Sequence, residues 1–333
     1  MVSAIEDKAE PESVVCVDMG TTNTRVWLVS GYKVLARAQT QVGAGDTARD
    51  GSTTRLRAAL KNLIDEVCSE AASPSCVAAA GMITSSLGLA EVPHVEAPAG
   101  LQDLARSLQC HSFPDIAELP FFLVPGVRTG PSRCLPEMIG STDIMRGEET
   151  LCMGLIELGM LKGAAAVLTL GSHWKAIRID EHNRIASSVT SMSGELIHAA
   201  QTKTILATAV PGDRPASIDR RWLDAGMQEQ RRSGLPRALF CVRLLEQKSD
   251  STPEQRLSFL IGTFVAADLD ALVERATLSC DDRVVITGGG AVAEAWRHAL
   301  ATASINAEVL TDGQSERGLL AGLRSVVEQS NSE

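Results

Sequence analysis

The sequence contains one pattern twice, about 150 residues apart. At 14–29 the run VVCVDMGTTNTRVWLV has an apolar stretch, a turn rich in Gly and hydroxyl groups, and a second apolar stretch that begins with a basic residue. At 165–179 the run AAVLTLGSHWKAIRI repeats this order. A strand–turn–strand unit that recurs at this separation predicts two lobes of the same design.

The flanking segments extend both copies of the pattern. The first copy is followed by a third apolar stretch up to residue 41 and by a helical pattern at 54–68, with Leu and Ile on one face. After the second copy comes another strand pattern at 184–194. Strands alternating with helices in this way predict an α/β fold.

The length of 333 residues suits two domains of about 150 residues each. We expect an N-terminal lobe at 1–160 and a C-terminal lobe at 161–311, with the last helix, 312–330, able to pack back on the first lobe. No apolar run approaches the roughly 18 residues needed to span a bilayer, and the first residues, MVSAIEDKAEPES, do not resemble an export signal. Eight cysteines without a C-x-x-C pair indicate a reduced, cytoplasmic protein without disulfides or zinc.

The charge balance argues against nucleic acid as a partner. Thirty-one Lys and Arg residues stand against forty-one Asp and Glu, which gives a net charge of −10, and no basic block stands out. A small molecule is the more plausible ligand, and neither nucleic acid nor membrane is expected as a partner.

The first turn has the composition of a phosphate site. Asp18 ends a strand and is placed to hold Mg²⁺ through water, and the next residues offer backbone N–H groups and side-chain hydroxyls to a phosphate. These candidate phosphate ligands are Gly20, Thr21, Thr22 and Asn23. Taken alone, the same residues are also good hairpin chemistry, because Asx and Thr side chains cap their own turns.

The second turn strengthens the phosphate interpretation. Gly171 and Ser172 would face the first turn across a cleft, and Lys175 would neutralise phosphate charge there. His173 is more simply explained as a structural histidine. Two such turns predict a clamp on one triphosphate.

A third motif, ITGGG at 286–290, lies between a strand and a helix near the end of the chain. It is a weak dinucleotide fingerprint, because too little chain follows for the domain that such a fingerprint opens. We therefore expect Thr287, Gly288, Gly289 and Gly290 to contact an adenosine. The sequence has no G-x-x-x-x-G-K-[ST] motif, which excludes a P-loop enzyme.

The three motifs together resemble those of the superfamily of sugar kinases, actin and heat-shock chaperone ATPases. More narrowly, the chain resembles the 2-dehydro-3-deoxygalactonokinase family. The segments that carry this likeness are DMGTTNTRVWL (18–28), AGMITSSLGLAEVPHVEAPA (80–99), DIMRGEET (143–150), GSHWK (171–175), MSGEL (192–196) and RGLLAG (317–322). The chain departs from the family at Met19, where Trp is usual, and in the order Ser172-His173-Trp174-Lys175, where Thr-His-Ser-Lys is usual.

The resemblance implies two ribonuclease H-like lobes of the actin-like type with ATP in a cleft between them, Mg²⁺ as a cofactor, and plausibly a homodimer. It implies phosphorylation of the 6-hydroxyl of 2-dehydro-3-deoxy-D-galactonate, in galactonate catabolism. It places sugar contacts in the loop after Gly81, which includes Met82. Arg146 would bind the substrate carboxylate, and Arg25 is the other candidate, although it can instead pair with a protein carboxylate.

Phosphoryl transfer needs a carboxylate to accept the proton of the sugar hydroxyl. Asp143, Glu148 and Glu149 all qualify: related phosphatases favour the two Glu residues, and sugar kinases favour Asp. The two Glu residues can also simply occupy a helix N-terminus, where the helix dipole favours acids. Two other activities stay open, an ATPase regulator of the same fold and a phosphohydrolase, both without sugar kinase activity.

Overall fold

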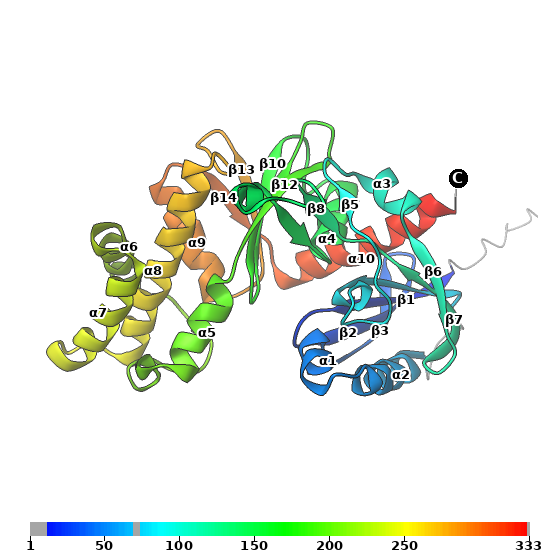
Figure 1. Ribbon diagram of the computed structural model, residues 1–333, viewed down its shortest axis with the longest axis horizontal. Helices are drawn as coiled ribbons and strands as arrows, with labels where there is room; N and C mark the ends of the chain where they lie inside the picture. The colour runs from blue at the N-terminus through cyan, green and yellow to red at the C-terminus, as the bar shows by residue number, and fades with distance from the viewer. Residues whose placement is uncertain (1–11, 69–73, 332–333) are drawn as a thin grey trace, which may run out of the picture.

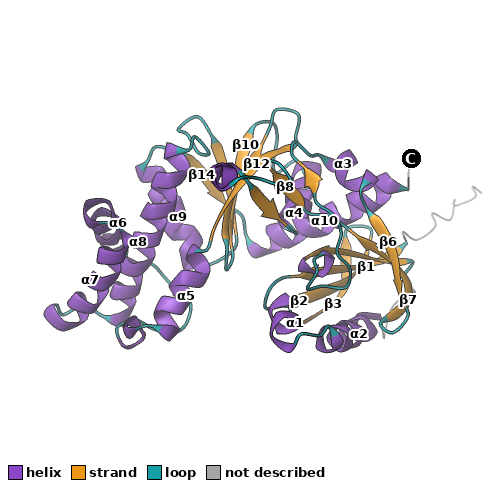
Figure 2. Cartoon of the chain, viewed as in Figure 1, coloured by secondary structure: helices purple, strands orange, loops and turns teal. Residues whose placement is uncertain are grey.

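The computed structural model describes residues 12–68 and 74–331. Residues 1–11, for which the sequence predicts no export signal, lie outside the described residues. Figure 1 shows two groups of strands, with helices α6 to α9 at one end, α1 and α2 at the other, and α4 and α10 between them. Figure 2 shows the same arrangement by secondary structure.

The first sheet has the strand order β3-β2-β1-β4-β7-β6. β1 pairs antiparallel with β2 and parallel with β4, which leaves the end of β1 in the middle of the sheet. The three strands predicted at the start of the chain are confirmed. The strands are β1 (Ser13–Met19), β2 (Thr24–Ser30), β3 (Lys33–Thr40), β4 (Cys76–Gly81), β6 (Gln109–Phe113) and β7 (Ala117–Leu123).

The second sheet repeats this core arrangement. Its order is β12-β11-β10-β13-β14, and β10 pairs antiparallel with β11 and parallel with β13. Asp18 lies opposite Arg25 in the first sheet, and Thr169 lies opposite Lys175 in the second. The strands are β10 (Ala165–Leu170), β11 (Trp174–Ile179), β12 (Ile185–Ser191), β13 (Arg283–Thr287) and β14 (Asn306–Val309).

A small sheet, β5-β8-β9, connects the two lobes. It consists of β5 (Val95–Glu96), β8 (Val127–Thr129) and β9 (Asp143–Met145), and it lies against β12. This region shows no periodicity in the sequence, because its strands are only two or three residues long.

The helices are mostly amphipathic and cover the sheets. In the second helix the predicted apolar face is confirmed, since Leu56, Leu60, Leu63, Ile64 and Val67 are buried. The α-helices are α1 (Ala44–Asp50), α2 (Thr54–Cys68), α3 (Leu101–Arg106), α4 (Glu148–Glu157), α5 (Ser193–Lys203), α6 (Arg220–Ser233), α7 (Leu235–Lys248), α8 (Pro253–Glu274), α9 (Ala291–Thr302) and α10 (Asp312–Ser330). Short 3₁₀ turns are η1 (Met82–Thr84), η2 (Pro136–Ser141) and η3 (Ile205–Thr208). None of the helices in the described ranges combines the length and the apolar character needed to cross a membrane.

Three hydrophobic clusters hold the fold together. One lies between the first sheet and α2, and a second lies between the second sheet and the helices α6, α8 and α9. The third joins the inner faces of both sheets through α4 and α10. Because neighbouring residues of a strand face opposite sides, Cys16 points into this shared cluster while Val15 and Val17 point to α2. Asp18 is two residues after Cys16 on the same strand, so its side chain leaves the same face of the sheet as that of Cys16.

Helices α4 and α10 cross at glycines. A Cβ added to Gly154 would lie 1.7 Å from the carbonyl oxygen of Gly318, and one added to Gly322 would lie 1.9 Å from that of Thr150. No side chain fits between the two backbones. This close crossing fixes α4, and so the residues that begin it, against the C-terminal helix.

Candidate active site

The two predicted phosphate turns are exposed hairpins at the ends of buried strands. In the first, the backbone N–H of Gly20 donates to the carbonyl of Asn23 at 2.9 Å, which closes the turn. Thr21, Thr22 and Asn23 are exposed, as are Gly171 and Ser172 in the second hairpin. Their donors are therefore free to meet a ligand.

Each hairpin is fastened to the helix that follows the third strand of its sheet. The N–H groups of Ala44 and Gly45 donate to the carbonyls of Gly20 and Thr21, at 3.1 and 2.8 Å. A Cβ on Gly43 would lie 2.6 Å from both of these carbonyl oxygens. The turn can occupy this position only because residue 43 lacks a side chain.

The second lobe uses the same device. The N–H of Glu195 donates to the carbonyl of Ser172 at 2.7 Å, and a Cβ on Gly194 would lie 2.2 Å from the carbonyl oxygen of Gly171. Sequence reasoning missed both anchoring glycines. The available signal was a glycine shortly after the third strand of each repeat, in VGAG and in MSG.

Asp18 lies at the junction between the first hairpin and α4. Its Oδ2 accepts hydrogen bonds from Arg25, with Nη2 at 2.5 Å and Nε at 3.2 Å. A Cβ on Gly81 would lie 3.3 Å from its Oδ1, and one on Gly147 would lie 3.9 Å away. Two glycines thus leave space beside the one carboxylate oxygen that Arg25 does not contact.

The three candidate bases have different surroundings. The carboxylate of Glu149 is fully buried and accepts the N–H of Gly147 at 2.8 and 2.9 Å, together with the hydroxyl of Thr150 at 3.1 Å. Asp143 Oδ2 accepts the hydroxyls of Ser188 and Thr190, at 2.5 and 2.9 Å. Both oxygens of Glu149 and the Oδ2 oxygen of Asp143 thus accept hydrogen bonds within the protein.

Glu148 differs from both. Its Oε2 is buried and has no hydrogen-bond partner in the part of the chain that the structure describes. Burial raises the pKa of this carboxyl group, the Lys175 ammonium opposes that rise, and the Asp18 carboxylate adds to it. Glu148 is therefore within electrostatic reach of both repeated strand pairs.

Lys175 is buried, with 5% of its surface exposed. Its Nζ donates to Thr190 Oγ1 at 2.8 Å and to the carbonyl of Ile144 at 3.1 Å. The Trp174 side chain points the other way and packs edge-on against Trp296, with ring centroids 5.5 Å apart. Met19 is likewise fully buried, in the cluster with α2. The two departures from the family pattern thus fill hydrophobic clusters on the far side of each sheet.

The candidate substrate arginines are already engaged. Arg25 is paired with Asp18, as described. Arg146 donates from Nη1 to Thr84 Oγ1 and from Nη2 to the carbonyl of Val92, both at 2.8 Å, and Nη2 also contacts His94. Arg146 thereby ties the 82–94 segment, including Met82, to the start of α4. Burial lowers the pKa of His94 to about 4, and the neighbouring Arg146 contributes, so this histidine is neutral.

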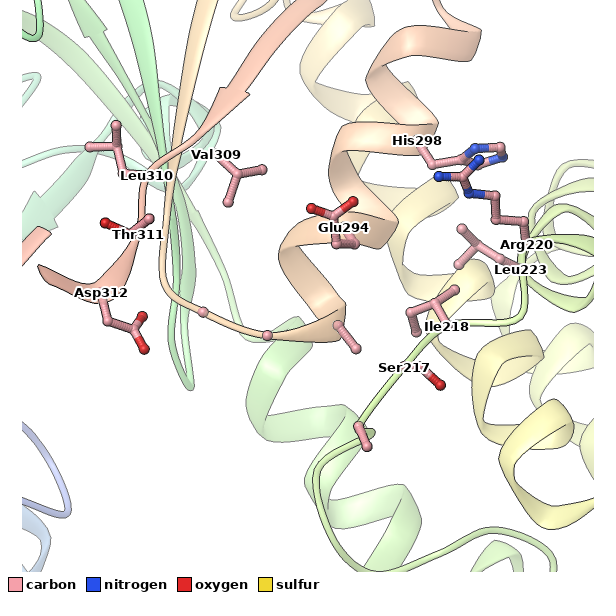
Figure 3. A pocket seen from close by; sticks show the side chains of 14 residues that line it. Ser217, Ile218, Arg220, Leu223, Glu294, His298, Val309, Leu310, Thr311 and Asp312 are labelled. Atoms are coloured by element: carbon pink, nitrogen blue, oxygen red, sulfur yellow. The ribbon is translucent and has the colours of Figure 1, made fainter. Parts of the chain in front are cut away.

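A pocket of about 560 Å³ lies at the third motif. Figure 3 shows its walls: Val309 to Asp312 on one side, Glu294 and His298 from α9, and Ser217, Arg220 and Leu223 opposite. Gly289 and Gly290 line it, whereas Thr287 is buried in β13 and Gly288 packs on the carbonyl of Leu170. Only half of the predicted adenosine motif reaches this pocket. The other lining residues come from 216–223, 291–298 and 309–312, and the first and last of these segments carried no sequence signal.

Among the described residues, no three or more His, Cys, Asp and Glu side chains group in a way that holds a metal ion. Mg²⁺ does not need such a group, because it binds through one or two carboxylates and the phosphates of its nucleotide.

The model of a family described as 2-keto-3-deoxy-galactonokinase matches residues 18–324. The 2-dehydro-3-deoxygalactonokinase of Escherichia coli strain K12 is 24% identical over 313 residues, which are 94% of this chain and 96% of that protein.

Two solved structures show the same fold. A protein from Sinorhizobium meliloti, provisionally assigned as a 2-dehydro-3-deoxygalactonokinase, superposes with a TM-score of 0.75 at 23% identity, over 95% of this chain and 98% of that one. The activator of 2-hydroxyisocaproyl-CoA dehydratase from Clostridium difficile, with bound ADPNP, gives 0.53 at 14% identity, over 96% of each chain. The predicted α/β fold, with two lobes of the actin-like ATPase and sugar kinase type, is confirmed.

Proposed function

Because the chain belongs to the 2-keto-3-deoxy-galactonokinase family and is therefore a kinase, we propose that it transfers the γ-phosphoryl group of ATP to the 6-hydroxyl of 2-dehydro-3-deoxy-D-galactonate. The reaction would belong to galactonate catabolism. The observation that carries this proposal is the buried Oε2 oxygen of Glu148, which has no hydrogen-bond partner among the described residues and lies within electrostatic reach of Asp18 and Lys175.

Glu148 is our choice for the catalytic base. A base must have a free oxygen to accept the hydroxyl proton, and Glu148 Oε2 has one. Glu149 and Asp143 are the weaker candidates, because both oxygens of Glu149 accept a backbone N–H and the Oδ2 oxygen of Asp143 accepts two hydroxyls. Glu149 instead holds the first turn of α4, which sets the position of its neighbour.

The two hairpins bind the β- and γ-phosphates. Phosphoryl transfer has a loose transition state, so positioning and charge neutralisation supply most of the catalysis. Thr21, Thr22 and Asn23 would donate from the first lobe, and Gly20, whose N–H closes the turn, would let the backbone approach the phosphates. Gly171, Ser172 and Lys175 would donate from the second, with Lys175 as the only cation among them.

Asp18 is the residue that would hold Mg²⁺, through water. A side chain at Gly81 or Gly147 would place its Cβ within 4 Å of Asp18 Oδ1, so the two glycines keep this oxygen open to a water ligand of the ion. Bound there, Mg²⁺ would neutralise phosphate charge. The Arg25 pair keeps the carboxylate oriented.

The pocket of about 560 Å³ is the proposed adenosine site. It has apolar walls at Ile218 and Leu223 and polar groups at its edge, which is the usual composition of a small-molecule pocket. Gly289 and Gly290 allow the backbone to approach the nucleotide closely. Thr287 and Gly288 would support this turn rather than contact the ligand.

Sugar-acid binding is proposed for the segment around Met82, which Arg146 ties to α4. Arg146 keeps N–H groups on Nε and Nη1 that none of its three contacts uses, and either can donate a charge-assisted hydrogen bond to a carboxylate. Arg25 is the weaker candidate for binding the substrate carboxylate, because it is already paired with Asp18.

The remaining proposals come from the sequence. They are lobe boundaries at 1–160 and 161–311, a cytoplasmic location and a possible homodimer. α10 packs against α4 and α3, which agrees with assigning the last helix to the first lobe.

The test is ADP release with Mg-ATP and no acceptor, with 2-dehydro-3-deoxygalactonate, or with its gluconate epimer. Stimulation by the galactonate compound alone is expected, and Glu148→Gln should abolish it. Glu157→Gln, an exposed position on the same helix, is the matched control. ATP turnover that neither sugar acid changes would instead indicate a regulator or a phosphohydrolase.

A further inference from the structure

The ammonium group of Lys175 is held in a well-defined position without a carboxylate partner. It is buried, and within the described ranges no Asp or Glu oxygen pairs with it inside 4 Å. Two of its three N–H groups are used, one by Ile144 and one by Thr190. The third has no hydrogen-bond partner in the part of the chain that the structure describes, and it can donate to a ligand.

The hydroxyl of Thr190 has one proton, and the contacts show where it goes. Asp143 Oδ2 can only accept at 2.9 Å, so Thr190 donates to Asp143. The Thr190 oxygen therefore offers a lone pair to Lys175 at 2.8 Å. This gives a directed chain from Lys175 to Thr190 to Asp143.

We propose that Asp143 is a positioning residue for phosphoryl transfer, which fixes the Lys175 ammonium through the hydroxyl of Thr190. The inference rests on the proposed kinase function. It gives a role to a carboxylate whose contacts make it a weak candidate for the base.

The position of Asp143 in the fold supports this role. Asp143 and Ile144 belong to β9, in the small sheet, whereas Lys175 and Thr190 belong to β11 and β12 of the second lobe. A second contact, from the N–H of Ser188 to Thr129 Oγ1 at 2.9 Å, joins the same two sheets. β9 thus contacts Lys175 twice, directly through a carbonyl and indirectly through Asp143.

A lysine side chain is long and flexible, so an ammonium that must meet a developing phosphate charge gains from being held in advance. Without Thr190 or Asp143, Lys175 would retain the Ile144 carbonyl and lose its second fixed direction. The expected loss is therefore in the chemical step rather than in sugar binding.

Four variants separate this role from a general effect on folding. Thr190→Val removes the hydroxyl at nearly constant volume, and Thr190→Ser restores it. Asp143→Ala removes the acceptor. Thr142→Val is the matched control. Thr142 precedes Asp143 in the chain, but its hydroxyl donates to the carbonyl of Ile139 and takes no part in the contacts of Lys175.

Steady-state ADP release should show kcat lowered about tenfold to hundredfold in Thr190→Val and Asp143→Ala. KM for the sugar acid should stay within about threefold, and Thr190→Ser and Thr142→Val should resemble the wild type, since neither loses the fixed ammonium. Wild-type kcat in Thr190→Val would overturn the proposal, and so would a Thr190→Ser variant as slow as Thr190→Val.

A second readout is independent of the reaction. In ¹⁵N-lysine-labelled protein, a buried, hydrogen-bonded ammonium gives a signal that exchanges slowly with water, and Lys175→Met identifies it. The signal should persist in Thr142→Val and disappear in Thr190→Val. If no sugar acid stimulates the wild type, the proposed function is wrong. The Lys175 signal still tests the positioning proposal in that case. Persistence of the signal in Thr190→Val would overturn the proposal that Thr190 fixes the ammonium.

Discussion

The carboxylate of Glu149 accepts the backbone N–H of Gly147 with both oxygens, at 2.8 and 2.9 Å. This contact ties the first turn of α4 to its own N-terminus, whereas Oε2 of the preceding residue, Glu148, is buried without a hydrogen-bond partner among the described residues. Two neighbouring acids of one motif thus acquire different roles, one structural and one proposed as catalytic.

Replacement of Glu148 tests that division. Glu148→Gln should lower kcat by about 10²–10⁴-fold, the usual contribution of a general base. ADP affinity, measured by calorimetry, should stay near the wild-type value, because no nucleotide contact is proposed for Glu148. A variant that keeps full kcat would exclude Glu148 as the base and return attention to Asp143.

Glu149 should make stability depend on pH. Burial, and then the neighbouring Glu148, raise the pKa of Glu149 from 4.5 to about 7 in the folded protein. Between these values the folded state binds more protons than the unfolded state, so the free energy of unfolding falls as pH rises through this window.

Glu149→Gln should remove this dependence, which amounts to at most about 3 kcal/mol. Urea denaturation at pH 5 and pH 8 gives the measurement: the difference between the two pH values should be smaller in the variant than in the wild type. Glu157→Gln should keep the wild-type difference. An equal difference in Glu149→Gln would show that Glu149 is not the titrating group.

The anchor of the second hairpin is predicted to be intolerant of a methyl group. In Gly194→Ala the new Cβ would meet the Gly171 carbonyl oxygen at 2.2 Å, so the hairpin must move away from α5. We expect a loss of about tenfold in ADP affinity or kcat, typical of a misplaced binding group. Gly212→Ala is the control and should bind ADP normally. Apart from its chain neighbours, no described atom would lie within 4 Å of the added Cβ.

The crossing of α4 and α10 should be just as sensitive, in stability. Gly322→Ala would place a Cβ 1.9 Å from the Thr150 carbonyl oxygen, and overpacking of this kind costs about 1–3 kcal/mol. Gly313→Ala, in the same helix but in open space, should instead stabilise by up to about 1 kcal/mol. Denaturant midpoints of the two variants should therefore move in opposite directions. Equal shifts of the two denaturant midpoints would mean that α4 and α10 accommodate the Gly322→Ala methyl group at no cost in stability.

The sequence alone determined the repeated strand–turn–strand units, the apolar face of α2 and the α/β fold class. These features depend on residues that are close together in the sequence. They are the alternation along a strand, the 3.6-residue period of a helix and the glycines of a turn. The sequence also supplied the short list of acids in DIMRGEE, with no means of choosing among them.

Only the tertiary structure distinguished those acids, because their surroundings come from residues distant in the chain. Asp143 accepts hydroxyls of β12, Glu149 folds back on Gly147, and Glu148 Oε2 is buried without a hydrogen-bond partner among the described residues. The adenosine pocket likewise combines α6, α9 and the start of α10. Burial and hydrogen bonding decide what a carboxylate can do, and both are properties of the packed chain rather than of the motif.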